Sequence, residues 1–323
     1  MVVNYIFRNK NKGGFSIEEL YASVISNLPP EVEVNIVELP HDGASLRSLV
    51  LNICHVLNLK GIIHITGDVH YLALLPFKKS VLTIHDVMFL KGNVFKRLML
   101  TLLWFWLPSL FVKKITVISQ LSKKQVLEII PWVNKKTTVV YNPVNPKLKR
   151  DTRKTIRAIP HILHLGTKEN KNLINTIKGL NKIPCLLHIV GMLSKEQKKA
   201  LKDNQINFKN YRNVPFIKIK WLYENCDIVS FISLYEGFGM PIIEAQQVGR
   251  VIVTSEKGAI PEIAQDTVHY VDPYDCDSIH SGFLKVINNE DYRFSLINKG
   301  FKNIERFSLN EVTNQYINIY NQL

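Results

Sequence analysis

Two carboxylates and two glycines lie close together in the second half of the sequence. Glu236 and Glu244 are separated by seven residues, and Gly237 and Gly239 lie between them. Carboxylates accept hydrogen bonds from sugar hydroxyls, and glycines allow a ligand to approach the main chain closely. This combination suits a ligand that carries both hydroxyl and phosphate groups, such as a nucleotide sugar. The alternative is a tight turn with two solvated glutamates, which an isolated Gly-x-Gly usually indicates.

The elements predicted around this turn would give it an anion-binding geometry. The apolar run 228–233 predicts a buried strand. Pro241 predicts the first position of a helix, which Gly249 would end. The main-chain N–H groups of residues 237–240 would then lie at the helix N-terminus, where the helix dipole favours phosphate. Both carboxylates would lie at that same end of the helix.

The segment 236–244, Glu-Gly-Phe-Gly-Met-Pro-x-x-Glu, resembles the two-glutamate signature of glycosyltransferase family 4. That family contains retaining enzymes of GT-B fold, including transferases of bacterial polysaccharide and lipid-linked sugar synthesis. The segment 166–173 resembles the family's Gly-Thr-x-x-x-x-Lys-Asn-Leu, although it is one residue shorter. The pair 85–86 resembles its strand ending in His-Asp, and the segment 258–262 resembles a further family motif.

The resemblance implies a role for each matching residue. Glu244 would hold the ribose hydroxyls of the donor, Glu236 its sugar hydroxyls, and Lys171 the leaving diphosphate. His85 would contact the donor sugar or phosphate; the alternative is a core histidine at a strand end. The catalytic candidates are Glu236, His85 and Lys171, and the donor-binding candidates are Gly13, Gly14, Thr167, Val214, Gly237, Phe238, Gly239, Met240 and Glu244.

The resemblance also implies a mechanism without a metal ion or other cofactor. The sugar would be transferred with retention by front-face displacement, while the enzyme stabilises the developing phosphate charge; double displacement is the alternative. Thr167 stands where many family members have an arginine, and Lys168 is a candidate for the missing charge. Asp275 and Asp277 form an Asp-x-Asp, but they precede a helical run and are better explained by helix capping.

Strands and helices alternate along the chain, which predicts parallel sheets covered on both faces. With the resemblance, this predicts an α/β protein of GT-B fold, with two Rossmann-like domains facing across a cleft. Residues 1–149 would be an acceptor-binding domain and residues 150–323 a nucleotide-sugar-binding domain. The polar, basic run 147–155 predicts the linker, and the last helix, about 310–323, would pack back on the first domain.

Composition limits the class of protein. The chain has 323 residues, of which 46% are hydrophobic and 21% charged, as in ordinary globular proteins. Its four cysteines are scattered without a C-x-x-C, which indicates neither a zinc site nor a disulfide framework and favours a reducing compartment. The N-terminal residues read as a first strand rather than a signal peptide, and we expect a cytoplasmic protein.

Positive charge is concentrated in the first half of the chain. The formal net charge is +14, and residues 78–150 alone contain 14 basic and 2 acidic residues. Such asymmetry indicates an anionic partner, for which a membrane surface is one choice. Within this stretch, residues 98–112 are apolar, too few to span a bilayer, and flanked by Lys96-Arg97 and Lys113-Lys114. They are either a buried helix or a surface of a peripheral enzyme at the inner face of a membrane.

Three functions remain open at this stage. The first is a retaining hexosyltransferase that uses a nucleotide sugar and a saccharide or lipid-linked acceptor in the synthesis of cell-surface polysaccharide such as lipopolysaccharide. The second is a catalytically silent subunit that binds a nucleotide sugar. The third is a basic nucleic-acid-binding protein, but the aromatic and basic interleaving of a known module is missing. We therefore favour the first and expect no nucleic acid partner.

Overall fold

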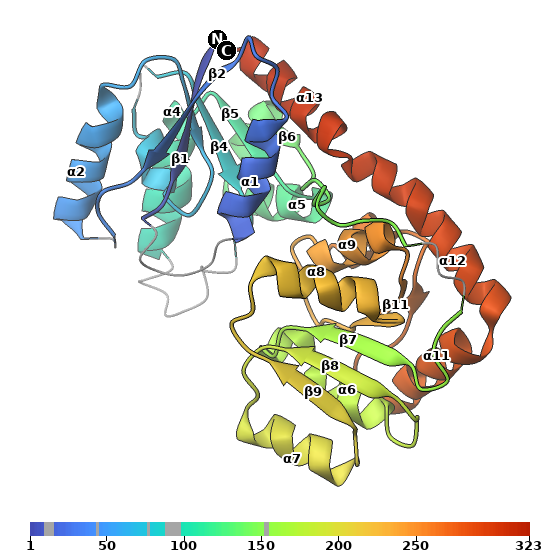
Figure 1. The fold of residues 1–323 in the computed structure, drawn as a ribbon. Coiled ribbons are helices and arrows are strands. Elements are labelled where there is room, and N and C mark those ends of the chain that lie inside the picture. Colours follow the sequence, from blue (N-terminus) through green and yellow to red (C-terminus); the bar gives the residue numbers. More distant parts are fainter. Residues whose placement is uncertain (10–15, 43–44, 76–77, 88–97, 152–154) are drawn as a thin grey trace. The chain divides into compact units, whose positions relative to one another are not determined.

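The chain forms two compact units, each built around one sheet (Figure 1). The computed structural model describes residues 1–9, 16–42, 45–75, 78–87, 98–151 and 155–323, so Gly13, Gly14, Lys96 and Arg97 lie outside the described residues. The first unit comprises Met1–Pro143 and Leu309–Leu323, and the second comprises Val144–Ser308. Each unit contains a six-stranded sheet, and the strand pairs of both sheets are parallel. The predicted α/β class is confirmed.

The sheet of the first unit has the strand order β2-β1-β3-β4-β5-β6. Its strands are β1 (Val2–Phe7), β2 (Glu33–Glu38), β3 (Ile62–Ile65), β4 (Ser80–Ile84), β5 (Lys114–Val117) and β6 (Thr137–Val139). Apolar side chains from α1 (Ser16–Ser26) and α13 (Leu309–Asn321) cover one face. The other face is covered by α2 (Leu46–Leu57), by the helical segment ending in α4 (Leu107–Phe111), and by α5 (Gln120–Ile129).

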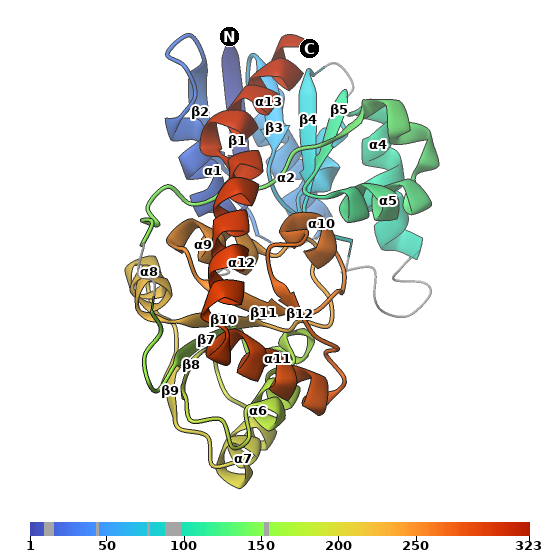
Figure 2. The same ribbon diagram turned by 90° about the vertical axis from the view of Figure 1, so that its right-hand side faces the viewer.

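Helix α13 is fixed to the first unit by a buried polar network as well as by apolar contacts (Figure 2). The hydroxyl of Tyr320 lies 2.8 Å from that of Tyr5 and 2.6 Å from His64 Nδ1. One turn earlier, the Tyr316 hydroxyl lies 3.1 Å from that of Tyr21. Buried polar groups need partners, so the sheet and the last helix depend on each other.

The sheet of the second unit has the order β12-β11-β10-β7-β8-β9. Its strands are β7 (His161–Leu165), β8 (Leu186–Val190), β9 (Phe208–Tyr211), β10 (Ile228–Phe231), β11 (Val251–Thr254) and β12 (His269–Tyr270). Its helices are α6 (Leu173–Gly179), α7 (Lys195–Asp203), α8 (Phe216–Asn225), α9 (Met240–Val248), α10 (Ile260–Ala264), α11 (Cys276–Asn288) and α12 (Glu290–Asn303). The chain runs outward from β7 to β9 and then returns to β10 beside β7. The β7–β10 pair is therefore the switch point of the sheet, where such folds bind ligands beyond the carboxyl ends of the strands.

The described residues of the basic run predicted as a linker, 147–151, pack against the second unit. The side chain of Leu148 is buried, and the guanidinium of Arg150 lies 3.5 Å from the ring centre of Phe301. Asp151 is paired with Arg250. Residues 147–151 thus pack on the second unit, and the division between the two units lies between Pro143 and Val144. The role of residues 147–155 as a linker stays a prediction.

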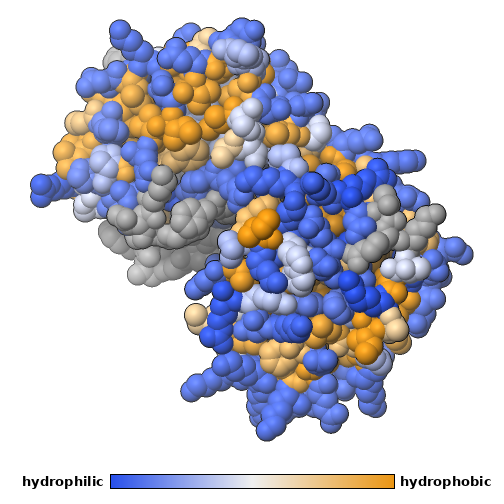
Figure 3. Space-filling model, viewed as in Figure 1, coloured by the Kyte–Doolittle hydropathy of each residue, from blue (hydrophilic) through white to orange (hydrophobic). Residues whose placement is uncertain are grey.

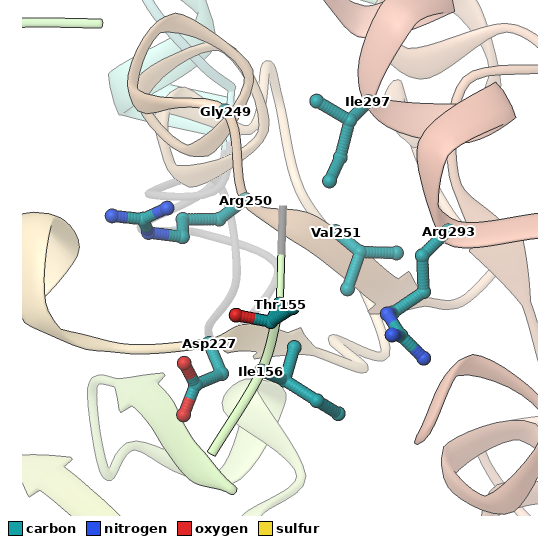
Figure 4. Close-up of a pocket in the computed structure, with 8 residues that line it drawn as sticks. All are labelled: Thr155, Ile156, Asp227, Gly249, Arg250, Val251, Arg293 and Ile297. Atoms are coloured by element: carbon teal, nitrogen blue, oxygen red, sulfur yellow. The ribbon is translucent and has the colours of Figure 1, made fainter. Parts of the chain in front are cut away.

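A small polar cavity lies at the amino ends of β10 and β11 (Figure 4). Its volume is about 20 Å³, which is room for about one water molecule. Arg293 lines it and donates to the carbonyls of Val286 and Ile287 at the end of α11. Because it is at the opposite end of the strands from the switch-point loops, we assign it a structural role.

Candidate functional site

Lys171 and Glu236 meet at the carboxyl end of the second sheet. Lys171 Nζ lies 2.6 Å from Glu236 Oε1, and both side chains are partly exposed. Lys171 follows β7 and Glu236 follows β10. Because these parallel strands are neighbours, two residues that are 65 positions apart in the sequence share one site.

Main-chain contacts fix the two loops to each other. Leu234 N donates to the Asn170 carbonyl at 2.8 Å, and Asn170 Nδ2 donates to the Tyr235 carbonyl at 3.2 Å. Asn172 adopts a left-handed conformation (φ 58°), and its side-chain amide donates to the Pro273 carbonyl at 2.7 Å. The loops that carry Lys171 and Glu236 are therefore held to each other by hydrogen bonds.

Two glycines leave room for the charged pair. Gly166 has φ +91°, and a Cβ there would lie 2.9 Å from Lys171 Cγ. Gly258 has φ +64°, and a Cβ there would lie 2.4 Å from the Glu236 carbonyl oxygen. Both positions combine a left-handed backbone with close packing, so only glycine fits without moving Lys171 or Glu236.

Glu244 is held by a residue that no sequence motif singles out. The Tyr223 hydroxyl, on α8, donates to Glu244 Oε2 at 2.6 Å. Burial raises the pKa of Tyr223 well above its ordinary value, and the charge of Glu244 raises it further. Tyr223 therefore stays protonated and remains a donor. Arg250 supports it by donating to the Tyr223 carbonyl at 3.0 Å and the Glu224 carbonyl at 2.7 Å.

The glycine-bearing turn forms the start of α9. Gly239 has φ 108° and precedes Met240, where the helix begins, so Pro241 is its second residue rather than the predicted first. Gly249 ends the helix with φ 83°, as predicted. The ring of Phe238 is buried and contacts Phe307 edge-on, with ring centres 5.8 Å apart. Phe238 can therefore meet a ligand only through its main chain.

The other predicted residues of the second unit lie in flanking loops. Thr167 follows β7, and its hydroxyl donates to the Met192 carbonyl at 2.8 Å. The Thr167 carbonyl accepts from Gln197 Nε2 at the same distance. Val214 is half-buried in the loop after β9. Gly13 and Gly14 were predicted from the first unit and cannot be placed, because they lie outside the described ranges.

His85 lies at the end of β4 in the first unit. Its Nε2 donates to the Thr66 carbonyl at 3.0 Å, which places the ring proton on that nitrogen. Burial lowers the pKa of His85, although the Thr66 carbonyl and the charges of Asp68, Asp86 and Glu18 oppose the shift. His85 is therefore a neutral imidazole near neutral pH.

Another buried histidine lies near Lys171. Burial lowers the pKa of His164 to about 3, and the charge of Lys171 lowers it further. Its Nδ1 lies 3.4 Å from the Ser230 hydroxyl. His164 is thus a neutral core residue.

The Asp-x-Asp sequence caps a helix. The Asp275 side chain accepts a hydrogen bond from Asp277 N at 2.9 Å at the start of α11, so the capping interpretation is confirmed. Among the residues described, no three His, Cys, Asp or Glu side chains cluster as metal ligands would. The expectation of a metal-independent reaction stays a prediction.

Comparison with known proteins finds a family similar to the second unit. Residues 146–303 match the family model of glycosyl transferases group 1. The match lies within the second unit, covers just under half of the chain, and spans the positions of Lys171, Glu236 and Glu244. The second unit is therefore similar in sequence to a group 1 glycosyl transferase domain. Family 4 within that group, and the roles of the three residues, stay predictions.

Individual relatives extend the comparison. The chain is 30% identical over 125 residues to O-antigen chain mannosyltransferase B of Escherichia coli, covering 39% of this chain and 32% of the relative. It is 26% identical over 233 residues to the uncharacterized glycosyltransferase MJ1607 of Methanocaldococcus jannaschii, covering 64% of this chain and 59% of the relative. The matches thus span less than two thirds of either relative.

The structure is also similar to the crystal structure of Anabaena Alr3699/HepE in complex with UDP and glucose. The superposition covers 100% of both chains, with a TM-score of 0.77 at 15% sequence identity. This likeness confirms the predicted GT-B fold class.

Proposed function

We propose that the protein is a retaining glycosyltransferase in the synthesis of cell-surface polysaccharide. It moves a hexose-type sugar from a nucleotide-sugar donor to a saccharide or lipid-linked saccharide acceptor. The contact between Lys171 and Glu236 beside the start of α9 carries the proposal, because a cation, a carboxylate and a helix N-terminus together suit a sugar diphosphate. The mannosyltransferase relative supports a hexose, and the UDP-bound structure supports a nucleotide donor.

Each charged residue of the site has a distinct proposed task. Lys171 and the main chain of residues 237–240 bind the diphosphate. Glu236 accepts hydrogen bonds from the transferred sugar, and Glu244, oriented by Tyr223, accepts them from the ribose. Lys171 and Glu236 pair with each other at 2.6 Å, so the diphosphate replaces Glu236 as the partner of Lys171. Glu236 then turns to the sugar hydroxyls.

A second cation is needed because Thr167 stands where related enzymes have an arginine. Lys257 fits this need better than Lys168. It precedes Gly258, which packs on the main chain of Glu236, and its Nζ lies 5.4 Å from the ring centre of Tyr274. The loop of Tyr274 is in turn fixed beside Lys171 by the hydrogen bond between Asn172 and Pro273. Lys168 is exposed, so its charge is more strongly screened by solvent.

The reaction follows from these roles. The bond between the anomeric carbon and the phosphate oxygen breaks while the acceptor hydroxyl attacks from the same face. The acceptor proton passes to the leaving phosphate oxygen. Lys171 stabilises the negative charge that develops on that oxygen. Electrostatic stabilisation of this kind is usually the largest single contribution to the catalysis of such reactions. His85 is the proposed contribution of the first unit, through contact with the donor sugar or phosphate.

A panel of nucleotide sugars tests the proposed function. A donor near 100 times its dissociation constant stabilises the folded protein by about 2.7 kcal/mol, which a thermal shift detects. The stabilising donor is then incubated with lipid-linked and free saccharide acceptors, with and without EDTA, and nucleotide release and the anomeric product are followed. We expect turnover with retention that EDTA leaves unchanged. If no nucleotide sugar stabilises the protein, the proposal fails; binding without turnover on any acceptor identifies a silent binding subunit instead.

A further inference from the structure

A row of exposed apolar residues lies on the outer face of the first unit. Leu98, Leu102, Trp106 and Leu110 follow one another at intervals of four, with relative exposures of 60%, 36%, 43% and 62%. The segment is helical from residue 98, passes through a π-helical turn, η4 (Thr101–Trp106), and ends as α4. Exposed leucine and tryptophan side chains in a contiguous row indicate an interaction surface.

The π-helical turn reduces the winding of this row around the helix. In an α-helix a step of four residues overshoots a full turn by about 40°, so a row at that interval would wind around the helix. A π-helical turn contains more than four residues, and the same step there falls short of a full turn. The shortfall between Leu102 and Trp106 partly offsets the overshoots of the two steps on either side, so the four side chains stay on one face.

Pro108 explains why the π-helical turn forms. Proline has no N–H to donate to the carbonyl four residues earlier, and its ring crowds that carbonyl. Here the carbonyl belongs to Trp104, and it accepts a hydrogen bond from His70 Nδ1 at 3.0 Å instead. The widened turn therefore costs no hydrogen bond at Trp104.

Two indole rings are presented with their polar groups turned inward. Trp106 Nε1 donates to the Ile129 carbonyl, and Trp132 Nε1 donates to the Ser109 hydroxyl, each at 3.0 Å. The two rings meet edge-to-face with centres 5.8 Å apart, and both are more than 40% exposed. Their apolar surface is thus available to a partner while their N–H groups are satisfied.

Helix α2 adds a second apolar row to the same layer. It packs on the same core as the π-helical segment, through Val56 and Phe105 respectively, so both helices turn their outer faces away from the sheet. Figure 3 shows hydrophobic residues gathered on the surface of this unit. Ten of the twenty exposed large hydrophobic side chains of the described residues belong to this layer: Leu46, Val50, Leu51, Leu57, Leu98, Met99, Leu102, Trp106, Leu110 and Trp132.

Positive charge borders the row. Residues 98–136 contain six lysines and one acidic residue, Glu128. Lys136 donates to the carbonyls of Ser109 and Val112 at the end of α4. Burial lowers its pKa, and the nearby charge of Lys113 lowers it further. Lys113 and Lys135 are exposed at this same end of the row.

We propose that this face of the first unit binds the surface of an anionic lipid bilayer. The row of Leu98, Leu102, Trp106 and Leu110 dips into the boundary between headgroups and acyl chains, and the lysines contact lipid phosphates. An exposed apolar row with tryptophan and bordering lysines fits the interface of an anionic membrane. No helix in the described ranges is long and apolar enough to cross a bilayer. Membrane binding by this face does not depend on which donor the protein uses. It would bring the protein to a lipid-linked acceptor.

Flotation with vesicles tests the inference. The full chain is mixed with phosphatidylcholine vesicles with or without phosphatidylglycerol, at low and high salt. We expect flotation with anionic vesicles only, and its loss at high salt. Leu102→Ser with Leu110→Ser should weaken binding about tenfold or more. The matched control, Ile159→Ser with Ile217→Ser, removes residues of the second unit that are at least as exposed, and it should bind as the parent does.

A charge-matched pair and a spectroscopic readout complete the test. Lys113→Glu with Lys135→Glu should abolish flotation, whereas Lys195→Glu with Lys198→Glu on α7 makes the same charge change and should not. Brominated lipid should quench tryptophan emission in the parent, and the quenching should largely disappear in Trp106→Phe with Trp132→Phe. The inference would be overturned by equal binding to neutral and anionic vesicles, or by equal effects of each variant and its control. It would also be overturned if this face only joined two copies of the chain. Nucleotide thermal shifts on the same variants report donor binding separately.

Discussion

At the scale of single residues, orientation of the carboxylates is as informative as their identity. Glu244 is one accepting group among many on the surface, but Tyr223 donates to it from a buried position at 2.6 Å. A hydrogen bond to a charged group contributes about 1.5–3 kcal/mol. Tyr223 is therefore the residue through which the core of the second unit determines where Glu244 points.

Removing this hydroxyl should weaken nucleotide binding without removing the carboxylate. Tyr223→Phe keeps the ring and its packing, so we expect nucleotide affinity to fall by about tenfold. Glu244→Ala should cost more, and the double variant little more than Glu244→Ala alone, because both changes remove the same interaction. Calorimetric titration of the nucleotide measures this. Additive losses would show that Tyr223 acts elsewhere.

The two lysines considered for the second phosphate contact can be separated directly. Lys257→Ala should weaken binding of a nucleoside diphosphate several-fold more than that of the nucleoside, because only the diphosphate needs the cation. Lys168→Ala is the matched control and should change neither affinity. Titration of both ligands into both variants decides. A larger loss with Lys168→Ala would return the role to that residue.

The sequence made Glu236, Glu244 and Lys171 candidates because each lies in a short motif with a fixed spacing, and their roles stay predictions. It could not predict Tyr223, which lies 21 residues before its partner in a helix whose pattern resembles that of any surface helix. The pairing of Lys171 with Glu236 was equally hidden, since it depends on β7 and β10 being neighbours. Long-range contacts of this kind follow from strand order and not from local composition.

At the scale of elements, the pattern of apolar residues predicted strands and helix ends correctly where a single local signal determines them. The apolar run 228–233 predicted a strand, which is β10 (Ile228–Phe231), and Gly249 ends α9 as predicted. Local pattern gave no sign that Leu148, an apolar residue within the basic run 147–151, is buried in the second unit. It also gave no sign of the π-helical turn before Pro108, because that depends on His70 from another segment.

Buried neutral histidines within the strands should make stability fall in acid. Burial lowers the pKa of His64 on β3 and of His164 on β7 to about 3, against about 6.5 in the unfolded chain. A depressed histidine pKa contributes stability that is complete above pH 6.5 and is lost as the pH falls toward 3. By pH 5 each residue should cost about 2 kcal/mol.

Thermal unfolding between pH 7.5 and pH 4.5 tests this. We expect the midpoint to drop as the pH falls below about 6.5, and His164→Asn, measured against the parent, to show a shallower slope. A midpoint that is flat down to pH 5 would mean that neither histidine must stay neutral for the fold to persist.

At the scale of the whole molecule, the last helix belongs to the first unit although it follows the second in the chain. Deleting residues 309–323 would leave the hydroxyls of Tyr5 and Tyr21 and His64 Nδ1 without the partners that they have on α13. Each unsatisfied buried group costs about 1–3 kcal/mol. We therefore expect the truncated protein to be insoluble. If it is soluble, denaturant unfolding should show that its free energy of unfolding is lower by well over about 3 kcal/mol. A soluble truncation of unchanged stability would contradict the role given to this helix.

The central claim concerns the pairing of Lys171 with Glu236, and one measurement tests it most directly. The nucleoside diphosphate of the stabilising donor is titrated calorimetrically into the parent, Lys171→Ala and Glu236→Ala. Loss of the cation should weaken binding about 10–100-fold. Loss of the carboxylate should leave binding unchanged or tighter, because it removes a competitor for Lys171 and a like charge, while turnover of the nucleotide sugar is lost in both. Equal binding to the parent and Lys171→Ala, or an equal loss in both variants, would contradict the account.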